Sequence, residues 1–204
     1  MRQWQLSFLG RLRAAAVFVL MMPAVAVAEP YIFDRGYTLI TFSWNHLGLT
    51  RQQGRVNGYE GTFDIDPADP EKSTFEVTMR VNSLQTGVDA LDRILRSADY
   101  FDAARFPVMT FKSTSVKRTG ETTAEVAGDL TVRGVTKPVV LNVRLNFNGA
   151  HPLATVNPAY TGKRVLAFSA TTTLKRSDFE ITRATPMVSD EIEIAIESEL
   201  VSRE

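Results

Sequence analysis

The sequence predicts an all-β fold, an eight-stranded antiparallel barrel with a short amphipathic helix inserted between strands 3 and 4. Apolar residues recur at every second position in eight successive segments, which is the period of a half-buried strand. Turn-forming residues separate these segments, as they do between antiparallel neighbours. One segment instead has helical spacing. A sandwich fits the same pattern, but we favour the barrel because closure leaves no exposed strand edge.

The first 28 residues have the layout of a cleavable secretory signal. Three arginines form a positively charged start, an apolar run follows over residues 14–27, and small residues end it. The run is shorter than the roughly 20 residues that a transmembrane helix needs. We therefore expect cleavage of residues 1–28 after Ala28 and export to the periplasm, with an extracellular location as an alternative. The mature chain, residues 29–204, has the length of one domain.

Charge and cysteine content exclude several classes of protein. The chain has 23 basic and 23 acidic residues, and losing the three signal arginines leaves 20 against 23, a net charge of −3. Nucleic acid is not an expected partner, because a mildly acidic protein lacks the basic field that phosphate binding needs. There is no cysteine. A disulfide framework and an N-terminal lipid anchor are therefore excluded.

The first three strands are predicted at residues 40–44, 59–65 and 75–81. The third is the clearest, since its apolar residues share one face and its Glu, Thr and Arg residues occupy the other. A turn rich in Asp and Pro separates the second from the third.

The segment 88–102 carries apolar residues at helical spacing and mostly charged residues, Asp92 among them, on the other side. We predict a short amphipathic helix with Leu91, Leu95 and Phe101 against the barrel interior. The helix can serve as a lid that completes a solid core, or as one wall of a ligand cavity. The sequence leaves both interpretations open.

The remaining strands are predicted at residues 109–111, 124–132, 139–147, 166–174 and 192–200, with short turns between most of them. Alternation places the aromatic residue at the end of the third of these strands, Phe147, on the inward face.

Only two histidines are available for acid-base chemistry, His46 and His151. His151 lies in the longest irregular stretch, residues 150–162, which we expect to form a mobile rim. A small-substrate hydrolase or isomerase using His46 stays open as an alternative, because catalytic groups converge in space. No Gly-x-Ser-x-Gly elbow supports it, and neither histidine has a second one at metal-ligand spacing. We therefore expect a protein that is not an enzyme and has no metal.

Two stretches resemble the YceI-like family. Residues 95–102, LRSADYFD, with the RFP and FKST that follow, resemble the most recognisable segment of that family. Residues 126–139, VAGDLTVRGVTKPV, resemble its turn between two strands. Shorter matches begin at Phe42, Arg176 and Val188. The resemblance extends in order over almost the whole mature chain.

The resemblance implies a lipocalin-like barrel that is exported and binds polyisoprenoid or related amphiphilic lipids in an elongated channel. Three positions depart from the family pattern. Leu91 and Ile94 stand where an arginine and a histidine are common, so the head-group preference can differ. Glu180 stands where a glycine is usual, which implies either an ordinary φ there or a positive φ that is tolerated at a cost.

An eight-stranded barrel is just wide enough to be filled by side chains or to hold one slender ligand. The sequence does not decide between the two, and the resemblance favours the ligand. We expect an isoprenoid lipid or an isoprenoid quinone, held for storage or transport, and no other cofactor. His46 and Arg176, with Arg93 and Arg96, are expected near the mouth. The predicted ligand-binding residues are Phe42, Trp44, His46, Phe63, Val77, Met79, Leu91, Leu95, Phe101, Met109, Phe111, Leu130, Leu141, Val143, Phe168 and Arg176.

We expect the barrel not to span a membrane. A transmembrane barrel is the alternative, but it needs an apolar outer band with aromatic girdles. The inserted helix and the short charged turns favour a soluble barrel. A homodimer is left open.

Overall fold

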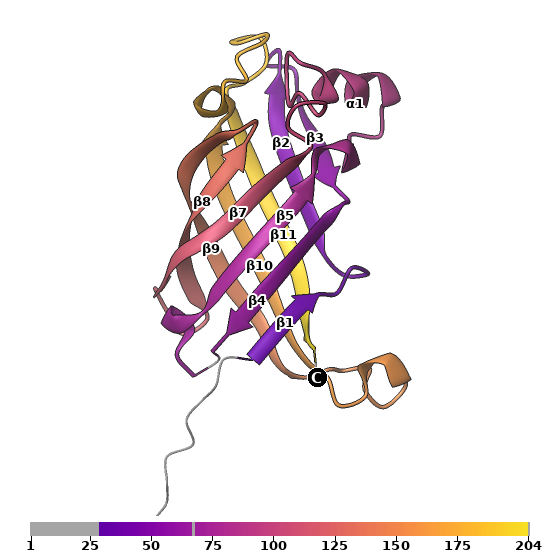
Figure 1. Ribbon diagram of the computed structural model, residues 1–204, viewed down its shortest axis with the longest axis vertical. Helices are drawn as coiled ribbons and strands as arrows, with labels where there is room; N and C mark the ends of the chain where they lie inside the picture. The colour runs from indigo at the N-terminus through magenta and orange to yellow at the C-terminus, as the bar shows by residue number, and fades with distance from the viewer. Residues whose placement is uncertain (1–28, 67, 204) are drawn as a thin grey trace, which may run out of the picture.

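The computed structural model describes residues 29–66 and 68–203 (Figure 1). The predicted signal, residues 1–28, lies outside the described residues. One helix, α1 (Asp89–Arg96), accompanies strands β1 (Glu29–Phe33), β2 (Leu39–His46), β3 (Thr50–Val56), β4 (Tyr59–Ile65), β5 (Thr74–Arg80), β6 (Leu84–Gln85), β7 (Val108–Arg118), β8 (Thr123–Val132), β9 (Val135–Ala150), β10 (Arg164–Lys175) and β11 (Glu191–Ser202). Short 3₁₀ turns lie at η1 (Pro70–Lys72), η2 (Val81–Ser83), η3 (Pro158–Tyr160) and η4 (Arg176–Phe179).

The sheet closes into an antiparallel barrel. Its order is β1-β4-β5-β7-β8-β9-β10-β11, and β11 pairs back with β1 to complete a ring of eight strands. The other three strands extend members of this ring. β2 follows β1 along β11, while β3 and β6 continue the pairing of β4 and β5. The predicted eight-stranded barrel is confirmed.

The inserted helix lies between the third and fourth strands of the ring, as predicted, but it is shorter than expected. It ends at Arg96, and the following residues to Phe106 form successive turns. Leu95 is buried, and Leu91 and Phe101 pack against the same apolar cluster, as the helical spacing predicts. No helix in the described part of the chain is long and apolar enough to cross a bilayer.

The predicted polar face of the helix needs one correction. Asp92, expected among the charged residues on the side away from the barrel, is buried. Its Oδ1 accepts hydrogen bonds from the Thr86 backbone N–H and hydroxyl, each at 2.7 Å. Burial alone raises the pKa of Asp92, but the bonds from Thr86 and the charges of Arg96 and Arg93 outweigh it and lower the pKa. Asp92 thus fastens the start of α1 to the segment before it.

The predicted inward orientation of Phe147 is wrong, because a β-bulge interrupts the pairing of β9 with β10. The pairing of β10 with β9 shifts between Ala167 and Phe168, so Phe168 pairs with Leu145 while Ala167 pairs with Phe147. The extra residue breaks the inward-outward alternation, and Phe147 is 42% exposed. Leu145, which the alternation places on the same face, lies before the bulge and lines the interior as predicted.

The two ends of the barrel differ (Figure 1). α1, the β2–β3 turn and the loop of residues 180–190 lie together at one end, which we call the α1 end. The loop of residues 151–163 and the C-terminus lie at the other.

Candidate functional site

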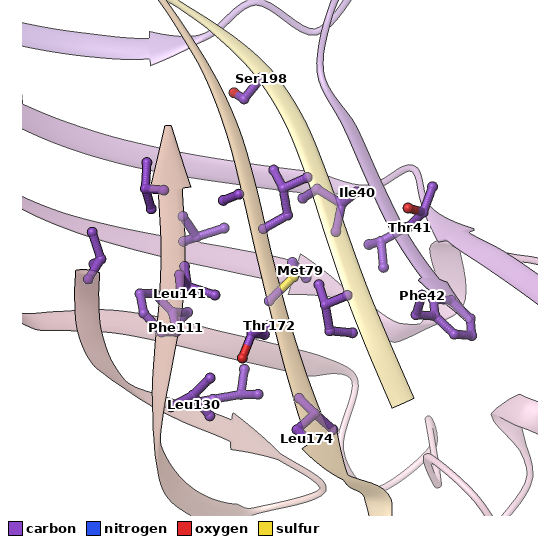
Figure 2. Close-up of a pocket in the computed structure, with 18 of the residues that line it drawn as sticks. Ile40, Thr41, Phe42, Met79, Phe111, Leu130, Leu141, Thr172, Leu174 and Ser198 are labelled. Atoms are coloured by element: carbon purple, nitrogen blue, oxygen red, sulfur yellow. The ribbon is translucent and has the colours of Figure 1, made fainter. Parts of the chain in front are cut away.

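The barrel encloses a cavity of about 900 Å³, and every one of its strands contributes to the lining. Close-packed protein interiors contain few voids larger than a water molecule. Ligand-binding cavities commonly measure about 300–1,000 Å³. The barrel is therefore hollow, and the solid-core interpretation is wrong. Figure 2 shows part of the lining, with Met79 from β5, Leu141 from β9 and Thr172 from β10 facing the same space.

Aromatic side chains build one wall of the cavity. Phe63, Phe75 and Phe111 come from the neighbouring strands β4, β5 and β7 and stack in a row, with ring centroids 5.6 and 5.8 Å apart. Phe42 stacks on Trp44 along β2 at 5.7 Å. Such offset contacts between rings on one face of a sheet stabilise it and hold the rings in place.

Aliphatic side chains continue the lining on β8, which pairs with β7, and on β9, among them Leu130, Leu141 and Val143. Hydroxyls interrupt the apolar lining at Thr172 of β10 and Ser198 of β11 (Figure 2). A lining of this kind suits a hydrocarbon chain with few polar atoms.

The helix and the loop of residues 180–190 line the cavity at the α1 end. Leu91, Ile94 and Leu95 of α1 line it, as does Val188 of the loop. The helix therefore forms one wall of the cavity, and its interpretation as a lid on a solid core is wrong.

Every residue of the predicted ligand-binding set lines this cavity, whereas Arg93 and Arg96, also expected near the mouth, are not among the lining residues. Contact with a ligand remains a prediction. The residues are Phe42, Trp44, His46, Phe63, Val77, Met79, Leu91, Leu95, Phe101, Met109, Phe111, Leu130, Leu141, Val143, Phe168 and Arg176. Sequence reasoning missed the contribution of β11, where Ile192, Ile194, Ile196, Ser198 and Leu200 also line the cavity. The alternation that predicted this strand was the available signal.

Arg176 lies at the cavity but cannot offer a free cation to a head group. It is 6% exposed, and all five N–H donors of its guanidinium are used. The acceptors are the carbonyls of Ser189, Ile181, Arg183 and Val188 and the hydroxyl of Thr185, at 2.7–3.0 Å. The expectation of a head-group contact needs this correction, since Arg176 instead holds the loop of residues 180–190 in place.

Asp190 holds the other end of the same loop. Its carboxylate accepts hydrogen bonds from the Ser177 backbone N–H at 2.9 Å and from the Ser177 hydroxyl at 2.7 Å. Burial raises the pKa of Asp190, but these bonds and the nearby charges of Arg176 and Lys175 outweigh it and lower the pKa. The loop over the α1 end is thus fixed from both sides.

His46 lies at the end of β2 and is exposed, with its backbone in a bridge to Val188. Within residues 29–66 and 68–203, no side chain is hydrogen-bonded to its imidazole, so no group orients it as a general base. A catalytic histidine normally needs such a partner. No observation therefore favours the hydrolase or isomerase alternative.

His151 is buried in a polar cluster on the outside of the barrel. One of its ring nitrogens and carboxylate oxygens of Asp34 and Glu199 lie within 4.8 Å of one another. The His151 ring stacks on Tyr160 at 3.7 Å, and the Tyr160 hydroxyl donates to Asp34 at 2.6 Å. This set of residue types can ligate a metal, but the hydrogen bond that His151 accepts argues against that role.

In the neutral imidazole of His151, Nδ1 accepts the Leu153 N–H at 3.1 Å, so Nε2 carries the proton. Neither nitrogen then has a lone pair for a metal. The cluster instead anchors the loop of residues 151–163, whose ends are joined by the His151 N–H to Lys163 O bond of 2.9 Å. This loop lies at the end of the barrel opposite α1 (Figure 1), and its mobility remains a prediction.

Comparison with known proteins gives consistent results. The YceI-like domain model matches residues 31–200. A UPF0312 protein of Ectopseudomonas mendocina (strain ymp) is 37% identical over 176 residues, which cover 85% of this chain and 88% of that protein. A YceI protein of Campylobacter jejuni superposes with a TM-score of 0.70 at 29% identity, covering 78% of this chain and 90% of that one.

A polyisoprenoid binding domain from Saccharophagus degradans, implicated in plant cell wall breakdown, superposes with a TM-score of 0.60 over 86% of this chain and 99% of that one. At 15% identity this likeness concerns the fold alone.

Proposed function

The chain belongs to the YceI-like family, and we propose that it binds a long-chain isoprenoid lipid or isoprenoid quinone for storage or transport in the periplasm. The hollow barrel carries this proposal. Its cavity of about 900 Å³ is lined mainly by apolar side chains from the described strands and from α1. The polyisoprenoid binding described for the Saccharophagus degradans domain, which shares the fold, supports the same ligand class.

Burial of apolar surface alone accounts for the affinity expected of such a ligand, without specific polar contacts. Burial contributes roughly 25 cal/mol per Å² of apolar surface removed from water. A chain of about forty carbons, at about 0.3 kcal/mol per atom, reaches about −12 kcal/mol. That value corresponds to nanomolar affinity before ordering costs are subtracted.

An uncharged head group fits the α1 end best. Among the described residues that line this end, Arg176 is the cation, and its donors are all used by the protein. Leu91 and Ile94, which replace polar residues common in the family, make the surroundings more apolar. An isoprenol hydroxyl or a quinone ring loses less hydration there than a phosphate does.

The decisive experiment extracts the purified protein with organic solvent and identifies co-purified lipids by mass spectrometry. Val143→Trp, which fills part of the cavity, should lower the retained lipid several-fold. Val140→Trp is the matched control, because Val140 lies on the same strand, is 48% exposed and faces away from the cavity. Equal lipid content in the two variants, or no lipid in the unaltered protein, contradicts the proposal.

The periplasmic location has its own test. Intact-mass measurement of protein released by osmotic shock should give a chain that begins at Glu29. A chain that keeps residues 1–28 and stays with the cytoplasmic fraction contradicts export.

A further inference from the structure

Five large apolar side chains stand exposed at the α1 end of the barrel. Leu49 is 77% exposed, Met187 60%, Val88 55%, and Leu47 and Ile94 48% each. We call these five residues the apolar rim. Single exposed apolar residues are ordinary on protein surfaces, whereas a group gathered at one place marks an interaction site.

The apolar rim comes from three separate segments that the fold brings together. The Leu47 N–H of the β2–β3 turn donates to Met187 O of the loop of residues 180–190, at 2.8 Å. Val88 and Ile94 belong to α1 and the residue before it, at the same end of the barrel (Figure 1). Ile94 also lines the cavity, so the rim is continuous with the cavity wall.

The β2–β3 turn gives an independent reason to regard the rim as functional. Leu47 and Gly48 have φ values of 57° and 72°, and the Leu49 N–H bonds to His46 O at 3.0 Å. This tight hairpin turn favours Asn, Asp or Gly at both central positions. A leucine there has an unfavourable backbone conformation and an exposed apolar side chain. A leucine at position 47 improves neither the stability of the turn nor the solubility of the protein. Contact with a partner surface explains its presence.

We propose that the apolar rim docks the protein on a lipid bilayer, with the leucines of the β2–β3 turn entering the interface between head groups and hydrocarbon. Continuity with the cavity selects this partner, because a tail then passes from the bilayer to the barrel without crossing water. The charges beside the rim are mixed, because Arg183 lies 3.9 Å from Asp99 and α1 carries both Asp89 and Arg93. The surface therefore fits zwitterionic phospholipid and does not depend on anionic lipid. This docking surface rests on the proposed function, since a lipid carrier is what requires bilayer contact.

Vesicle flotation tests the docking surface directly. The purified protein should float with phosphatidylcholine vesicles, and Leu49→Asp should lower the bound fraction roughly tenfold, because it withdraws an apolar side chain and introduces a charge. Val156→Asp is the matched control, since Val156 is 75% exposed and lies in the loop at the opposite end. That variant should float like the unaltered protein.

Three outcomes overturn the docking surface: no flotation of the unaltered protein, equal flotation of the two variants, or self-association that Leu49→Asp abolishes. The last result assigns the rim to a second copy of the chain. Failure of the proposed function looks different. Extracts without lipid, combined with flotation that depends on Leu49, remove the isoprenoid ligand while the docking surface stands.

Discussion

At the scale of single residues, several side chains have functions that sequence patterns do not reveal. Arg176 was selected from the sequence as a cation for a ligand, yet it bonds five acceptors of its own loop. Its partners lie up to 13 residues away along an irregular segment, so spacing gave no sign of them. The apolar lining was predictable, because alternation along a strand determines which face a residue occupies.

Glu180 is the residue that departs from the family glycine, and its backbone gives a testable stability difference. It has φ 61° and ψ 23°, the left-handed conformation, directly after η4. A residue with a Cβ atom is strained there by about 1–2 kcal/mol. We expect Glu180→Gly to raise the free energy of unfolding by about 1 kcal/mol in urea titration, the gain being reduced by the greater freedom of an unfolded glycine.

Glu180→Ala is the control, because it removes the exposed carboxylate but keeps the Cβ atom. A gain in stability from alanine equal to that from glycine would show that charge, and not backbone strain, sets the effect.

At the scale of elements, the strands were predicted where apolar residues alternate and missed where they do not. β3 reads TRQQGRV, a largely polar segment that the barrel includes through its pairing with β2. β1 is five residues long and closes the ring without a clear pattern. The bulge in front of Phe168 and the end of α1 at Arg96 depend on tertiary contacts, so local periodicity did not indicate them.

The attachment of α1 gives the second prediction, which concerns acid pH. The lowered pKa of Asp92 means that its charged form is stabilised in the folded state. That contribution is present above the ordinary aspartate pKa of about 3.9 and is lost as pH falls through the lower folded value. Asp92→Asn keeps an acceptor for Thr86 but does not titrate.

We therefore expect the unaltered protein to have the higher thermal midpoint at neutral pH, and this difference to shrink as the pH falls below about 4. Asp190 titrates in the same range but is present in both proteins, so it cancels in the comparison. A difference in midpoint that stays constant down to pH 2 contradicts the assigned role of Asp92.

At the scale of the whole molecule, the closed ring explains why a hollow protein is stable. Two apolar clusters lie along the barrel, one beneath α1 and one where β1 meets β4 and β11. Their side chains form walls, and the ring holds these walls apart through hydrogen bonds along every strand. Tyr31 lies at the seam, pairing with Phe63 of β4 on one side and Ser202 of β11 on the other.

The stability of the fold at alkaline pH tests the role of Tyr31, where β1 joins β4 and β11. Tyr31 is fully buried, and its hydroxyl donates to Glu29 at 2.7 Å. Burial first, and then the bond to the Glu29 carboxylate, raise the pKa of Tyr31 to about 12. Because the folded pKa exceeds the unfolded value of about 10, the neutral tyrosine stabilises the fold below pH 10, and this stability is lost as pH rises towards 12.

Tyr31→Phe keeps the ring and cannot ionise, so the free energy of unfolding of this variant should fall less between about pH 10 and 12 than that of the unaltered protein. Tyr160, whose pKa is also raised to about 12, is common to both proteins. Parallel curves of stability against pH above 10 for the two proteins would contradict the prediction that ionisation of Tyr31 destabilises the fold.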